Sequence, residues 1–119
     1  MIKNKKVCFD IDGIICHTKN SDYRKSKPIK KNINFINKLY EQGFAINIYT
    51  ARFMGRNKDN VALAKKEGYK FTSLQLKKWR VKYNNLFFGK PSSDIYIDDK
   101  DLNFKKNWIK ILQKKTYKL

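Results

Sequence analysis

The feature that most constrains this chain is a series of short apolar runs, each of which stops at polar residues. Residues 5–10 form the first run, residues 44–50 (FAINIYT) the second, and residues 94–98 (DIYID) a third. Short runs that are rich in β-branched and aromatic residues and end at acids or glycine are typical of buried β-strands. Another short apolar run, at residues 86–88, precedes Gly89. We therefore expect several short strands.

The segments between these runs carry helical patterns. Pro28 suits the first turn of a helix, and Gly43 ends an apolar stripe at helical spacing that comprises Ile33, Phe35, Ile36, Leu39 and Tyr40. Three further helices are predicted, over residues 56–67, 72–83 and 102–115. Alternating strands and helices predict an α/β domain with a doubly wound, mainly parallel sheet. In such sheets ligands bind beyond the carboxyl ends of the strands.

The length of 119 residues fits one domain, which we place over residues 1–119. The first residues lack the apolar core of a signal peptide or of a membrane span, so we expect a cytoplasmic protein with no membrane partner. Residues 14–27 are mostly polar and predict a loop or flap. Residues 53–85 hold two helices that the sheet itself needs, which leaves no separate cap domain and an open site.

The net charge of +18 has two interpretations. Clustered lysine and arginine would favour nucleic-acid binding. The excess is spread along every segment, however, which favours solvated lysine and makes nucleic acid the weaker alternative. The acids are more informative, because six of only ten fall in two short clusters: Asp10 and Asp12, then Asp94, Asp98, Asp99 and Asp101.

The acids and their neighbours suit phosphoryl transfer. Carboxylates that converge from separate strands would repel one another unless a hard cation lay between them, and Mg²⁺ prefers oxygen ligands. Residues two apart at a strand end project the same way, so Asp10 can attack phosphorus while Asp12 reaches the leaving oxygen. The Thr50 hydroxyl and the Lys90 ammonium can hold the phosphoryl oxygens in the transition state.

Four motifs in order resemble the haloacid dehalogenase (HAD) superfamily. They are FDIDG at 9–13, IYTAR at 48–52, GKP at 89–91 and YIDD at 96–99. More narrowly, IYTARFMGRN, LQLKKW and FGKPSSDIYIDDK resemble the small capsule-biosynthesis phosphatases of that superfamily. The resemblance implies a Rossmann-like core and a phosphatase. Ile14 departs from the threonine that commonly follows the DxDG turn.

The resemblance also implies roles for individual residues. Asp10 would form an aspartyl-phosphate, Asp12 would act as general acid and then base, and Thr50 and Lys90 would bind phosphate. Mg²⁺ would be held by Asp10, by the Asp12 backbone carbonyl and by an acid of the last cluster. Asp99 is the first choice for that ligand, with Asp98 beside it or bonded to Lys90.

Four residues in or just after the first two motifs are candidates for substrate binding: Gly13, Ala51, Arg52 and Arg56. Arginine forms the better fork for carboxylate or phosphate, which is why the two arginines after Thr50 are singled out. The alternative for both is structural, as a salt bridge to Asp59 or a solvated helix start. The two interpretations are balanced for Arg52, and the structural one is favoured for Arg56.

Three functions compete. The first is a phosphatase for a small phosphorylated metabolite, such as a sugar or polyol phosphate of surface polysaccharide biosynthesis. The second is a nucleotide or nucleic-acid end phosphatase, and the third is a catalytically silent binding module of the same fold. A second subunit could cover the open site, so a homo-oligomer is compatible with any of them.

Overall fold

The computed structural model describes residues 5–89, 95–97 and 109. Three residues predicted for the site, Lys90, Asp98 and Asp99, lie outside these described residues. So does the predicted helix at 102–115, apart from Ile109, which is helical and packs against the core.

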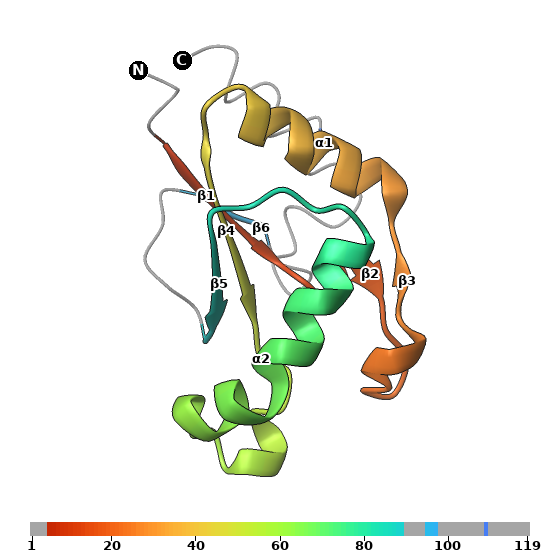
Figure 1. Ribbon diagram of the computed structural model, residues 1–119, viewed down its shortest axis with the longest axis vertical. Coiled ribbons are helices and arrows are strands. Elements are labelled where there is room, and N and C mark those ends of the chain that lie inside the picture. Colours follow the sequence, from red (N-terminus) through yellow and green to blue (C-terminus); the bar gives the residue numbers. More distant parts are fainter. Residues whose placement is uncertain (1–4, 90–94, 98–108, 110–119) are drawn as a thin grey trace.

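A four-stranded parallel sheet forms the centre of the protein (Figure 1). Its strands are β1 (Lys6–Asp10), β4 (Ala45–Thr50), β5 (Asn85–Phe88) and β6 (Ile95–Ile97), in the order β5-β4-β1-β6. After β1, the chain therefore adds β4 and β5 on one side of β1 and then places β6 on the other side of β1. This reversal of strand order beside β1 is the position where open α/β sheets bind ligands.

Two helices follow the first two strands of this sheet. Helix α1 (Lys30–Glu41) joins β1 to β4, and helix α2 (Val61–Lys78) joins β4 to β5. The predicted parallel sheet with connecting helices is confirmed. The doubly wound arrangement, which requires helices on both faces of the sheet, stays a prediction. Neither helix is long and apolar enough to cross a membrane, and the same holds for every helix in the described part of the chain.

The prediction of two helices at 56–67 and 72–83 is wrong. The structure has a short 3-10 helix, η3 (Gly55–Asn57), and then the single continuous helix α2. The buried face of α2 has four residues spaced four apart: three small ones, Ala64, Gly68 and Thr72, and then Leu76. Small side chains let the helix pack closely against the rest of the protein. They do not form the stripe of large apolar residues by which a helix is recognised in a sequence.

Two smaller differences concern the first helix. Pro28 does not open α1 but belongs to the short strand β3 (Lys27–Pro28), and Ile29 caps the helix. Tyr40 is 37% exposed, whereas the other four members of the predicted stripe are buried. Gly43 follows the helix with a φ of 96°, the left-handed conformation that glycine adopts without strain, and so ends it as expected.

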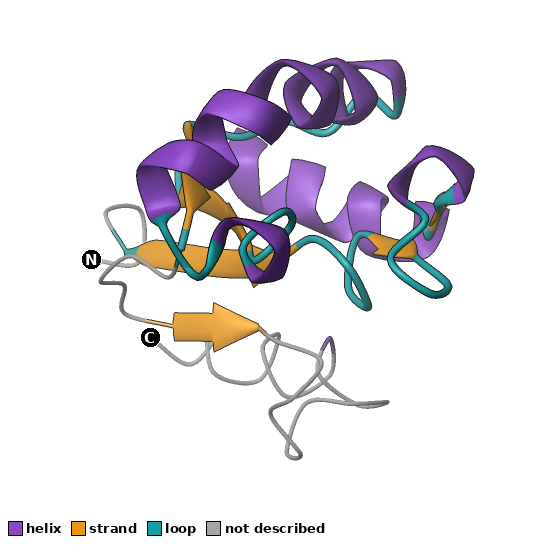
Figure 2. Ribbon diagram, turned by 90° about the horizontal axis from the view of Figure 1, so that it is seen from below, coloured by secondary structure: helices purple, strands orange, loops and turns teal. Residues whose placement is uncertain are grey.

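The predicted flap is a small antiparallel hairpin beside the main sheet (Figure 2). It pairs β2 (Cys16–His17) with β3, and a 3-10 helix, η2 (Tyr23–Lys25), lies between the two strands. The core includes fully buried side chains of β1, α1 and β4, such as Phe9, Ile36 and Ile48, and extends to residues of α2, β5 and β6. The flap is thus a small addition at the end of the sheet where β1 stops.

Candidate active site

The chain turns sharply after β1, and the turn presents two carboxylates. The Asp10 carboxylate accepts a hydrogen bond from the Ile11 amide (Oδ1 to N, 2.8 Å). The Ile11 carbonyl in turn accepts from the amides of Ile15 (2.8 Å) and Cys16 (3.2 Å), and Gly13 has a φ of 96°. A glycine is needed at this position because a Cβ is disfavoured at that angle. The turn brings the chain back beside the end of β1.

Asp12 is held by a buried arginine from the next strand. Arg52 follows β4 and is 1% exposed, and its guanidinium forks onto the Asp12 carboxylate. Nε lies 3.0 Å from Oδ2, and Nη2 lies 2.8 Å from Oδ1. Bonds between charged groups in this forked geometry are about twice as strong as neutral ones and fix the orientation of the carboxylate. Asp12 keeps 29% of its side chain exposed.

The flap contributes further partners to Asp12. The Thr18 hydroxyl donates to Asp12 Oδ1 at 2.5 Å and contacts the Ser26 hydroxyl at 2.6 Å. The Cys16 thiol lies 3.5 Å from the same carboxylate oxygen. Burial raises the pKa of Cys16 to about 11, and the nearby Asp12 charge adds to the rise against the opposing bond from Thr18. Cys16 is thus a neutral thiol in contact with the Asp12 carboxylate.

The remaining donors of Arg52 tie it to α2 and to the flap. Its Nη1 donates to Gln75 Oε1 at 2.6 Å, and Gln75 Nε2 donates to the Tyr23 carbonyl at 2.7 Å. The Arg52 guanidinium also lies over the Tyr23 ring, 4.7 Å from its centroid. One buried cation thereby connects β1, β4, α2 and the flap.

Thr50 lies at the end of β4 in the neighbouring strand. Its hydroxyl is buried, at 0% exposure of the residue, and accepts a hydrogen bond from the Arg52 amide at 3.0 Å. Its carbonyl accepts from the Gly89 amide at 3.0 Å, and the register pairs it with Phe88. Thr50 therefore lies at the carboxyl end of β4 and is bonded to Gly89, the residue that precedes Lys90 in the sequence.

Arg56 lies away from Asp12. Its guanidinium pairs with Glu67 of α2 at 2.8 Å, and both side chains are substantially exposed. The structural interpretation named Asp59 as the partner of Arg52 or Arg56, but the structure pairs them with Asp12 and Glu67 instead. Ala51 is exposed directly after Thr50.

The oxygen atoms at the end of β1 are suitable ligands for a hard cation such as Mg²⁺. Asp10 supplies carboxylate oxygens, while the Asp12 carboxylate is engaged by Arg52 and Thr18, which leaves its backbone carbonyl as the candidate ligand. Within the described residues no group of three or more possible ligands comes together. The predicted third ligand, Asp98 or Asp99, directly follows the end of β6 in sequence but is not among those residues.

Sequence reasoning missed three residues that contact Arg52 or Asp12: Thr18, Tyr23 and Gln75. Tyr23 carried a signal, since it is an isolated aromatic residue in an otherwise polar flap. Gln75 could have been noticed only if 72–78 had been read as part of one long helix, with Leu76 buried beside it. Thr18 carries no signal beyond its short separation from Asp12.

No protein-family model matches the sequence, and no curated protein matches it. Among solved structures, a polypeptide of the Pnkp1/Rnl/Hen1 RNA repair complex is 15% identical with a TM-score of 0.47, over 94% of this chain and 32% of that one. D,D-heptose 1,7-bisphosphate phosphatase from B. bronchiseptica, complexed with magnesium and phosphate, is 10% identical with a TM-score of 0.49, over 97% and 64%. At these TM-scores neither likeness carries an argument about this chain.

A crystal structure of a target protein from Vibrio cholerae is much more similar. The two chains are 30% identical with a TM-score of 0.70, and the match covers 93% of this chain and 98% of the other. The identity extends along nearly the whole length of both proteins, and the fold agrees. This chain belongs to the same family as the Vibrio cholerae protein.

Proposed function

We propose that this protein is a magnesium-dependent phosphomonoesterase of the HAD type that works through an aspartyl-phosphate. The observation that carries the proposal is the arrangement at the end of β1, where Asp10 is followed by an acid whose orientation is fixed by a buried arginine. A chain that needed Asp12 only for solubility would have no reason to bury a cation against it, because burying a charge is costly.

The chemistry would proceed in two steps. In the first, an Asp10 carboxylate oxygen forms a bond to phosphorus, the bond between phosphorus and the ester oxygen breaks, and the leaving alkoxide takes a proton from Asp12. In the second step, the oxygen of a water molecule attacks the phosphorus of the aspartyl-phosphate while Asp12 accepts a proton from that water molecule. The bond from Asp10 to phosphorus then breaks, and inorganic phosphate leaves.

Other residues would stabilise the charge that develops on the phosphoryl oxygens. Thr50 and Lys90 are proposed as phosphate binders, with Gly13 and Ala51 offering nearby backbone. Bound Mg²⁺ would neutralise negative charge on the phosphoryl group, and its ligands would be Asp10, the Asp12 backbone carbonyl and Asp99, with Asp98 as the alternative.

The test is hydrolysis of p-nitrophenyl phosphate by the purified chain. We expect activity that requires Mg²⁺ and disappears in Asp10→Asn, because an amide neither attacks phosphorus nor balances the cation. Asp10→Asn protein with the thermal stability of the wild type and retained turnover would contradict the mechanism. A wild-type protein that binds phosphate esters without hydrolysing them would support the silent binding module.

The metal ligands can be separated from the acid. Asp99→Ala should weaken Mg²⁺ binding strongly, as measured by calorimetry, whereas Asp12→Asn should leave it nearly intact and slow turnover. Equal losses of Mg²⁺ affinity in the two variants would reverse the assignment.

The proposed substrate is a small phosphorylated metabolite such as a sugar or polyol phosphate, with surface polysaccharide biosynthesis in the cytoplasm as the context. The net charge of +18 favours one alternative, a nucleotide or nucleic-acid end phosphatase. A phosphate-release screen over sugar phosphates, polyol phosphates, nucleotides and 3′-phosphorylated DNA decides between them. Size-exclusion chromatography with light scattering tests whether a second subunit covers the site.

A further inference from the structure

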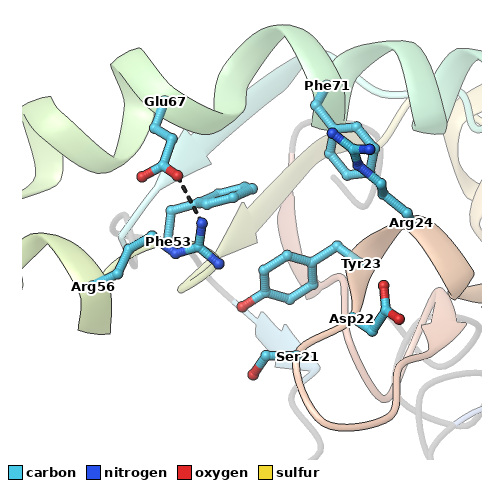
Figure 3. A pocket seen from close by; sticks show the side chains of 8 residues that line it. All are labelled: Ser21, Asp22, Tyr23, Arg24, Phe53, Arg56, Glu67 and Phe71. Atoms are coloured by element: carbon cyan, nitrogen blue, oxygen red, sulfur yellow. Dashed lines mark hydrogen bonds and ion pairs between the residues drawn. The ribbon is translucent and has the colours of Figure 1, made fainter.

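A pocket of about 310 Å³ lies between the flap, the loop after β4 and helix α2 (Figure 3). Its aromatic walls are Tyr23 and Phe53, whose ring centroids are 5.2 Å apart, together with Phe71. Arg24 and Arg56 also line it, and so do two carboxylates, Asp22 and Glu67, which are paired with Lys25 and Arg56. A pocket of this volume, with apolar walls and a few charged groups, has the character of a small-molecule site.

The aromatic wall is held in place by strained backbone and close packing. Phe53 has a φ of 66°, in the left-handed region that a bulky residue adopts only when its surroundings impose it. Its ring lies directly on Gly68 of α2, where an added Cβ would come within 2.2 Å of Cδ2. On the flap, Asn20 and Ser21 are also left-handed, with φ of 54° and 57°. Strain of this kind clusters at ligand sites.

Arginine is concentrated around this pocket. The chain has four arginines among its 28 basic residues, and three of them, Arg24, Arg52 and Arg56, line the pocket or contact its wall. Arg56 is paired with Glu67. Arg24 is exposed, and within the described part of the chain it has no carboxylate partner. A planar cation with free donors beside a pocket is suited to bind a carboxylate or phosphate group.

The pocket adjoins the proposed catalytic acid through one residue. Tyr23 contributes its ring to the wall and also lies against the Arg52 guanidinium, 4.7 Å from the ring centroid, and Arg52 holds Asp12. A group bound against Tyr23 would therefore be linked to Asp12 through the Tyr23 ring and the Arg52 guanidinium.

From these observations we infer that this pocket binds the organic part of the substrate, and that this part is a monosaccharide-sized group with a second negative charge. The inference rests on the proposed function. Arg52 lies over the Tyr23 ring and Arg56 over the Phe53 ring. The parts of these rings that the two arginines leave uncovered would pack against the apolar face of a sugar ring, and Arg24 would bind its second phosphate or carboxylate.

The test measures binding in Asp10→Asn protein, where hydrolysis is blocked. Calorimetric titrations with Mg²⁺ present would compare fructose 1,6-bisphosphate with fructose 6-phosphate. We expect the bisphosphate to bind at least about tenfold more tightly, and Arg24→Ala to remove most of that preference. Lys27→Ala is the control, since it removes the same charge from an exposed residue of the flap that lies outside the pocket.

Three results would overturn the inference: equal affinities for the two sugar phosphates, equal effects of Arg24→Ala and Lys27→Ala, or tighter binding of adenosine monophosphate than of the bisphosphate. The last would assign the aromatic wall to a nucleobase. Hydrolysis of p-nitrophenyl phosphate by the wild type is measured separately. An inactive wild type with a preference that depends on Arg24 would refute the proposed function and leave the pocket in place.

Discussion

Replacing Arg52 by lysine tests whether the buried arginine acts through Asp12 or on the substrate. Lysine keeps the positive charge but loses the planar fork, so it cannot reproduce the bonds from Nε to Oδ2 at 3.0 Å and from Nη2 to Oδ1 at 2.8 Å. It also loses the bond from Nη1 to Gln75 Oε1. Asp12 would stay ion-paired but would no longer have one fixed orientation.

The expected magnitude follows from these contacts. A hydrogen bond to a charged group contributes about 1.5–3 kcal/mol, and each 1.36 kcal/mol changes a rate about tenfold. If the fork serves to aim Asp12 at the leaving oxygen, Arg52→Lys should lower kcat about 10- to 100-fold with little change in KM. The loss should be larger for an alkyl phosphate than for p-nitrophenyl phosphate, because a good leaving group needs less protonation in the transition state.

A double-mutant cycle with Asp12→Asn completes the assay. If Arg52 works through Asp12, Arg52→Lys should change kcat less than about twofold in the Asp12→Asn background, since the group it aims is already lost. Arg80→Lys is the control, because this exposed arginine lies outside the site. An equal loss of kcat in both backgrounds would refute the reasoning and would restore Arg52 to direct contact with the substrate.

Three further predictions concern stability, reactivity and charge. Gly68→Ala should lower the unfolding midpoint by several degrees, because its Cβ would meet the Phe53 ring at 2.2 Å, whereas Gly55→Ala, with nothing within 4 Å, should be neutral or stabilising in the same thermal melt. Cys16 should react with iodoacetamide at pH 8 far more slowly than glutathione does, because its side chain is buried and its pKa is raised to about 11. Mass spectrometry measures the two rates, and comparable rates would contradict the site geometry. If the net charge of +18 comes from solvated lysine, DNA binding should be weak and its affinity should fall steeply as the salt concentration rises. The nucleic-acid alternative would be favoured if, at about 0.15 M ionic strength, a 3′-phosphorylated oligonucleotide were a better substrate than a sugar phosphate.

The strands could be predicted from the sequence because a strand that is buried on both faces has a continuous run of apolar residues. A parallel strand covered on both sides is continuously apolar, and the runs at 5–10 and 44–50 correspond to β1 and β4 within one residue at each end. Helix α2 could not be predicted in the same way. Gly68, a poor helix former, lies in the middle of its buried face, so the single helix appeared as two.

The site was predictable in part for a related reason. Residues that end strands converge wherever the sheet places those strands side by side, and the register confirms that β1 and β4 are adjacent, with Asp10 opposite Tyr49. The pairing of Arg52 with Asp12 depends instead on the turn at Gly13, on the flap and on the approach of α2. Those are tertiary contacts, and nothing in the spacing of 40 residues between the two side chains indicates them.

The contacts of the buried Arg52 also suggest how substrate binding in the pocket could be connected to catalysis at Asp12. Its guanidinium bonds the carboxylate of Asp12 on one side and lies over the Tyr23 ring on the other, and that ring is a wall of the pocket. Gln75 bonds both Arg52 and the Tyr23 carbonyl, which closes the network. Because residues in one hydrogen-bonded network are energetically coupled, a substrate that packed against Tyr23 would act on Arg52, the residue that orients the proposed acid. Changes at Tyr23 should therefore alter kcat together with KM, whereas a wall that only binds would alter KM alone.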